Sequence, residues 1–197
     1  MNLLSALQRR SNDVPVAHRS SSEAAHDGAA RDTVGLLGVP QTKIKVLGVA
    51  KFEKGDFQGA AANLLRSVDL TNDLYAILLR YLARARAGET SALAELQTRA
   101  GRLNAKNWPY AMIEFYLGRR TPEQALAAAG NPDQYCQAQF YIGQWHLVKG
   151  NAALAAAPLQ AAIATCPKDF IEFTGAVAEL KRMQPQKTTD TALAAKR

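Results

Sequence analysis

The sequence has little of what marks a disulfide-rich, metal-binding or membrane-spanning protein. Its 197 residues include two cysteines and three histidines. Two cysteines are too few for a disulfide scaffold, and Cys136 and Cys166 lack the spacing of zinc ligands. No apolar stretch reaches the roughly 18–20 residues that a membrane-spanning helix requires. What remains is a globular domain, for which a hydrophobic content of 48% is sufficient.

Clusters of positive charge are also missing, although the formal net charge is +7. Residues 1–40 carry four basic and four acidic side chains, residues 41–183 carry 17 and 12, and residues 184–197 carry three and one. The positive excess is therefore spread thinly, and no run of lysine or arginine marks a nucleic-acid or membrane patch. We expect neither a nucleic-acid partner nor a membrane span.

The sequence contains no set of residues that would form a catalytic, metal or cofactor site. It lacks an HExxH motif, a Ser/His/Asp arrangement and a glycine-rich phosphate loop. Cys136 and His146 would lie roughly 15 Å apart along one helix at 1.5 Å per residue, too far for a nucleophile and its base. We therefore expect a protein without enzymatic activity, cofactor or metal ion.

Both ends of the chain have compositions typical of disorder. Residues 1–40 are rich in serine, alanine and charge, residues 184–197 are similar, and neither segment contains an aromatic residue. At the start, the apolar core is too short for a signal peptide and the basic residues Arg9 and Arg10 follow it instead of preceding it. As written, the sequence predicts a cytoplasmic protein with one folded domain over residues 41–183.

Within that domain the apolar residues recur at helical spacing, and one helical hairpin occurs twice. Residues 41–72 and 136–169 match at a constant offset of 95 residues, which marks an internal repeat. The matched pairs are Leu47 with Ile142, Gly48 with Gly143, Gly55 with Gly150, Ala60 with Ala155, and Leu64 with Leu159. A small residue within each first helix allows the two helices to approach closely, and the later glycine allows the chain to reverse.

The remaining segments predict further helices of the same kind. Apolar spacing indicates helices over residues 74–85 and 92–103, which form a second hairpin, and a short pair of helices within 108–130, which forms a third. Thr121 and Gln124 have the spacing of a capping box, which favours a helix start. A last helix over residues 169–183 would cover the apolar edge of the final hairpin.

These residues resemble the tetratricopeptide repeat (TPR). Residues 136–169 fit best, with Ile142-Gly143, the turn glycine Gly150, then Ala155, Leu159 and Pro167. The resemblance covers about residues 41–183, and the order of segments is similar to the C-terminal part of bacterial TPR proteins, including envelope lipoprotein-type members. It implies an all-α fold, a TPR-like right-handed solenoid of about four antiparallel helical hairpins plus a C-terminal capping helix.

The resemblance also implies a function. TPR solenoids bind a peptide or protein segment in the groove lined by the first helices of their hairpins. Carried over by register, the groove residues are Lys45, Phe52, Gln137, Phe140 and Gln144. We expect a non-catalytic scaffold or adaptor that binds another protein or peptide.

An alternative is an envelope-associated or secreted bacterial TPR protein in which the disordered N-terminus is a targeting segment. It would be periplasmic or secreted. The resembling lipoproteins carry an export signal and a lipid-attachment cysteine near their start, and this sequence shows neither, so their location is not carried over.

The two cysteines fall at neighbouring ends of the last hairpin. Cys136 opens its first helix and Cys166 ends its second, and antiparallel helices bring such ends together. Inward-facing ends can approach the ~5.5–6 Å between Cα atoms that a disulfide requires. Two interpretations stay open: a disulfide that joins the helices, or two small buried thiols in a reducing cell.

Overall fold

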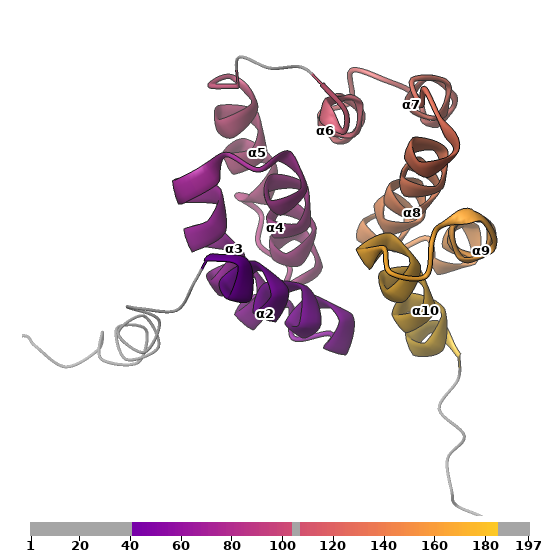
Figure 1. The fold of residues 1–197 in the computed structure, drawn as a ribbon, viewed down its shortest axis with the longest axis horizontal. Helices are drawn as coiled ribbons and strands as arrows, with labels where there is room; N and C mark the ends of the chain where they lie inside the picture. Colours follow the sequence, from indigo (N-terminus) through magenta and orange to yellow (C-terminus); the bar gives the residue numbers. More distant parts are fainter. Residues whose placement is uncertain (1–40, 104–106, 185–197) are drawn as a thin grey trace, which may run out of the picture. The chain divides into compact units, whose positions relative to one another are not determined.

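The computed structural model describes residues 41–103 and 107–184, and these ranges contain nine α-helices and no strand (Figure 1). The predicted disordered segments, 1–40 and 184–197, lie outside the described residues except for Gln184. The helices are α2 (Gln41–Lys54), α3 (Phe57–Thr71), α4 (Leu74–Arg86), α5 (Ala92–Ala100), α6 (Tyr110–Tyr116), α7 (Pro122–Ala127), α8 (Pro132–Val148), α9 (Ala152–Thr165) and α10 (Ile171–Met183).

Consecutive helices pair into four hairpins, α2 with α3, α4 with α5, α6 with α7 and α8 with α9, and α10 follows the last pair (Figure 1). A glycine with left-handed backbone stands after each first helix. These glycines are Gly55, Gly88, Gly118 and Gly150, with φ values of 83°, 82°, 72° and 75°. Glycine adopts positive φ without steric cost, which lets the chain reverse. The expected all-α, TPR-like architecture is confirmed.

Short polar side chains begin several helices. Asp56 accepts a hydrogen bond from the backbone N–H of Gly59 at 2.9 Å and so caps α3. At α7 the predicted capping box is present, because Thr121 accepts from the Gln124 N–H and the Gln124 side chain accepts from the Thr121 N–H. Each cap satisfies backbone donors that have no partner within the helix. The starts of these helices are therefore set by local sequence.

In the first hairpin, and again in the last, a leucine of the second helix packs directly against a glycine of the first helix. A Cβ atom added to Gly143 would lie 2.6 Å from Cγ of Leu159, and one added to Gly48 would lie 2.8 Å from Cγ of Leu64. Both leucines are fully buried. Only a glycine leaves room for this contact, which explains why glycine and leucine recur together at the offset of 95 residues.

One pair of repeat positions differs in burial. Ile142 is 7% exposed, whereas its counterpart Leu47 is 43% exposed. The hairpin of α6 and α7 precedes α8 and packs against it, but no described helix precedes α2. The two residues hold the same position on their helices, and their burial differs because it depends on the neighbouring hairpin.

The first helices of the hairpins lie against one another. Helix α4 contacts α2, α6 and α8, and α10 contacts α8, α9 and also α2. We use the name inner face for the surface that the neighbouring first helices form together and that α10 covers. None of the described helices has the combination of length and apolar character needed to cross a membrane.

The glycine–leucine contact yields a stability prediction. Gly143→Ala should lower the free energy of unfolding by about 1–3 kcal/mol, because the added methyl group overlaps Leu159 in a closely packed hairpin. Gly101→Ala is the matched control, since a Cβ there would be 3.6 Å from its nearest neighbours and the backbone φ is −66°. Urea unfolding followed by circular dichroism measures both. Equal stability of the two variants would contradict the close contact.

Candidate protein-interaction site

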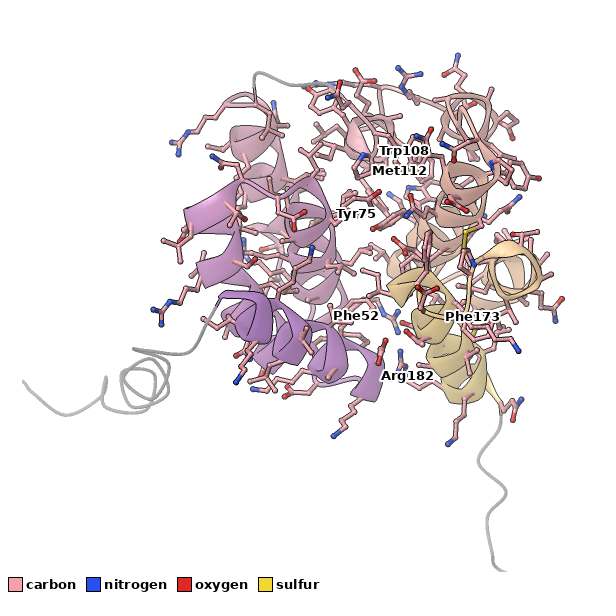
Figure 2. All side chains as sticks on the ribbon, in the orientation of Figure 1. Phe52, Tyr75, Trp108, Met112, Phe173 and Arg182 are labelled. Carbon is pink, nitrogen blue, oxygen red and sulfur yellow. A yellow bond between two sulfur atoms is a disulfide. The ribbon has the colours of Figure 1, made fainter. Side chains whose placement is uncertain are left out.

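A glutamine on α8 joins three helical segments on the inner face. The Oε1 atom of Gln137 accepts hydrogen bonds from the Tyr75 hydroxyl at 3.1 Å and from Trp108 Nε1 at 2.6 Å. Tyr75 belongs to α4, and Trp108 precedes α6. Gln137 is 8% exposed, so its polar group requires such partners. Figure 2 shows Tyr75 and Trp108 near each other between α4 and α8.

A buried carboxylate on α10 anchors a second polar cluster. The side chain of Glu179 is 1% exposed and forms ion pairs with Arg86 at 2.8 Å and with Arg182 at 2.9 Å. Gln144 Nε2 donates to the same carboxylate at 3.1 Å, and Arg86 Nη1 donates to Gln144 Oε1 at 3.1 Å. Burial alone would raise the pKa of Glu179, but the hydrogen bonds and charges of the two arginines outweigh it and lower the pKa. Glu179 is thus ionised and ties α10 to α4 and α8.

Helix α10 is also fixed to α2 and to the turn that follows it. The Thr174 hydroxyl donates to Glu53 Oε1, and Arg182 Nη1 donates to the Glu53 carbonyl oxygen. The guanidinium groups of Arg86 and Arg182 lie 4.5 Å and 5.7 Å from the centre of the Phe57 ring. Figure 2 places Arg182 and Phe52 where α2 and α10 face each other. These contacts close the inner face on the side of α10.

A second buried carboxylate on α10 has no cation in direct contact. Glu172 is 2% exposed and accepts a hydrogen bond from the Tyr141 hydroxyl at 3.3 Å. Burial raises the pKa of Glu172, and its backbone hydrogen bond, Tyr141 and the charge of Lys45 offset this only in part. Lys45 itself forms an ion pair with Asp73. Glu172 and Glu179 therefore have pKa shifts of opposite sign on one helix.

The structure engages each of the five sequence-predicted groove residues in contacts within the chain. Lys45 is half-buried beside Asp73, and Phe52 is 2% exposed and packs edge-on against Phe57. Phe140 packs against Gly175 of α10, where an added Cβ would lie 2.9 Å from its ring. Gln137 and Gln144 make the hydrogen bonds described above. Their contact with a partner stays a prediction, and a partner could reach the buried ones only after α10 moves.

Sequence reasoning predicted that the last helix covers the final hairpin, but it missed the contacts of α10 with α2. Glu172, Gly175, Ala176 and Glu179 are all buried. Their spacing of three and four residues puts them on one face of the helix, which is the signal that was available. The sequence could not show that this face meets α8 and α2, because those contacts join residues far apart in the chain. Arg86, for example, is paired with a carboxylate 93 positions away.

Three arginines that could have served an acidic partner are paired inside the chain. Glu95 of α5 forms ion pairs with Arg80, Arg84 and Arg99. Burial opposes ionisation of Glu95, but hydrogen bonds from Arg80 and Arg99 dominate and lower its pKa to about 2. Arg84 also pairs with Glu89. This cluster joins α4 to α5 and leaves these guanidinium groups largely occupied.

The two cysteines are bonded in the structure. The sulfur atoms of Cys136 and Cys166 lie 2.09 Å apart, with 5.1 Å between the Cα atoms. Cys136 stands in the second turn of α8, and Cys166 is the residue at which α9 ends. The bond joins the outer ends of the two helices, opposite the turn at Gly150.

Metal ligands do not gather in the described part of the chain. No group of three or more His, Cys, Asp or Glu side chains there lies close enough to hold an ion. His146, the histidine of the repeat, packs against Trp145 with its ring 5.0 Å away, and burial lowers its pKa. Its Nδ1 atom is buried without a hydrogen-bond partner among the described residues. The ring therefore occupies a packing position.

Comparison with known proteins finds a partial relative. No protein-family description matches the chain. The chain is 29% identical over 126 residues to a protein of Haemophilus influenzae named "Lipoprotein NlpI homolog", across 60% of this chain and 40% of that protein. It thus spans about 40% of the length of this curated relative. The similarity and the helical hairpins agree with a TPR-like repeat protein.

The raised pKa of Glu172 predicts a dependence of stability on pH. The folded pKa lies above the unfolded one, so the folded state binds more protons in that window and stability falls as pH rises through the folded pKa. Glu172→Gln should remove this loss, so the variant should be more stable than wild type at neutral pH. As the pH falls to the range in which an ordinary carboxyl group titrates, the stabilities of the two proteins should converge. Thermal unfolding at a series of pH values measures this, with exposed Asp169→Asn as the control. A constant difference at all pH values would contradict the assignment.

Proposed function

We propose that this chain is a non-catalytic module that binds a segment of another protein on its inner face. The observation that carries the proposal is the repeated hairpin, which sets the first helices α2, α4, α6 and α8 against one another. Stacked hairpins of this kind form extended binding surfaces. The face offers aromatic rings together with amide and charged groups, the combination that protein interfaces favour.

A protein partner fits the charge distribution better than a nucleic acid does. Arg80, Arg84, Arg86 and Arg99 are all paired with carboxylates of the chain itself. Nucleic-acid affinity depends on many basic groups that are free to contact phosphates. Because these arginines pair within the chain, this part of the surface has no set of basic groups free to contact phosphates.

Binding at the inner face requires α10 to give way. Phe140 and Gln144 contact α10 now, and a partner segment would replace its Gly175 and Glu179 at these positions. Lys45 is the accessible edge of the face, since its side chain keeps 32% of its exposure. The partner would meet Lys45 first and then the buried residues.

Site-specific photo-cross-linking tests this proposal. A photoreactive amino acid at Lys45 should capture a defined partner in cells, and the same amino acid at Leu154 of α9, which is 59% exposed, should not. Replacing Lys45 removes only a partly exposed ion pair worth about 0–1 kcal/mol, so the domain stays folded. Mass spectrometry identifies the captured protein. Capture from Leu154 without capture from Lys45 would exclude the inner face.

We also propose that the protein works in an oxidising compartment, either associated with the cell envelope or secreted. The Cys136–Cys166 bond favours this, because disulfides persist mainly outside the reducing cytosol. The similarity to a protein named as a lipoprotein points the same way. A cytoplasmic location, which the start of the sequence favoured, is the competing possibility.

Thiol labelling in cells tests the compartment. Cells are lysed under denaturing conditions with a bulky maleimide, and we expect no labelled chain without reductant and two labels per chain after reduction. The variant Cys166→Ser provides the control, because its remaining Cys136 should react without reduction. Full labelling of the wild-type chain before reduction would place the protein in a reducing compartment.

A further inference from the structure

The third hairpin is shorter than the others and leaves open space beside it. Helix α6 has seven residues and α7 has six, whereas the remaining described helices have nine or more. Two adjoining hollows of about 500 Å³ and 450 Å³ lie between α6, α7 and the start of α8. They share Glu114, Arg120 and Ala128 and together form one site, the α6–α8 hollow. Each volume falls within the range of ligand pockets.

Two adjacent arginines line one end of the α6–α8 hollow. Arg120 Nε donates to Glu114 Oε2 at 2.6 Å, while its Nη atoms donate no hydrogen bond to the described residues. The guanidinium is therefore held in place through Nε and presents its two Nη groups, the fork that binds a carboxylate through two hydrogen bonds. Glu114 balances one of the two positive charges. The side chain of Arg119 is exposed and makes no ion pair within the described ranges.

The other end of the hollow offers an aromatic surface and an amide. The indole of Trp108 is half-buried and fixed by its hydrogen bond to Gln137, and it lines the hollow. Gln134 Oε1 accepts from the Gly130 N–H at 2.8 Å, which leaves the amide NH2 as a donor. Each of these groups is anchored to the fold by one atom. Trp108, Gln134 and Arg120 are consequently positioned before any ligand arrives, which reduces the ordering cost of binding.

We infer that the α6–α8 hollow binds an extended acidic segment of another protein. A carboxylate of that segment would meet Arg119 and the Nη fork of Arg120, and an apolar side chain next to it would lie on Trp108. The surplus positive charge of Arg119 selects an acidic over a basic segment. The inference rests on the proposed function only in that the occupant is a protein segment, since the hollow is lined by residues outside the predicted groove set.

Fluorescence anisotropy with the full chain tests the hollow. The probe is a labelled hexapeptide of alternating glutamate and leucine, and the comparison peptide alternates lysine and leucine. Wild type should bind the acidic peptide, and Arg119→Gln or Arg120→Gln should each raise the Kd about tenfold, the loss expected for one hydrogen bond to a charged group. Arg102→Gln removes an exposed arginine outside the hollow and should leave the Kd within about twofold.

The outcomes separate this inference from the proposed function. Equal binding of both peptides, equal loss in Arg102→Gln and Arg119→Gln, or tighter binding of a labelled oligothymidylate than of the acidic peptide would each overturn the inference. Cross-linking from Lys45 is independent of these variants. Capture at Lys45 with no peptide binding means that the inner-face proposal stands and the hollow fails, and peptide binding without capture at Lys45 means the reverse.

Discussion

A leucine seated on a glycine fixes the distance between the helices of the first and last hairpins, and the rest of the arrangement depends on that distance. At Leu64 on Gly48 and at Leu159 on Gly143 the side chain touches the backbone of the facing helix. The contact sets which side of α2 and of α8 faces the paired helix and which side is left for the neighbouring hairpins. Packing within the first and last hairpins thus decides which side of α2 and of α8 can contribute to the inner face.

The inner face then has to accommodate polar groups in a buried setting. Gln137 accepts two hydrogen bonds, and Glu179 is matched by two arginines and an amide. Removing one partner would leave the other buried without compensation, which costs far more than the pair itself contributes. Glu172 is the exception, because no ion pair with a described arginine or lysine compensates its burial, although Tyr141 donates a hydrogen bond to it.

Local features were predictable from the sequence, and contacts between distant helices were not. The offset of 95 residues predicted both hairpins, and the capping box at Thr121 and Gln124 predicted the start of α7. These features depend on neighbouring residues or on a repeated pattern. The burial of Phe140 and Gln144 against α10 depends on how the hairpins stack. The positions of these two residues in the sequence do not predict it. The α6–α8 hollow was missed for a similar reason, because its lining comes from α6, α7 and the start of α8 and depends on how these helices pack.

The Cys136–Cys166 disulfide lies at the end of its hairpin opposite the turn at Gly150. This position determines what happens when a protease cuts the backbone at that turn. Gly150, Asn151 and the first residues of α9 are exposed, which makes the turn the kind of place where a protease cuts. After such a cut the backbone would be in two pieces, yet α8 and α9 would stay covalently joined at their other ends and packed through Leu159. A nicked molecule would keep its shape and would separate into fragments only when its sulfur atoms are reduced.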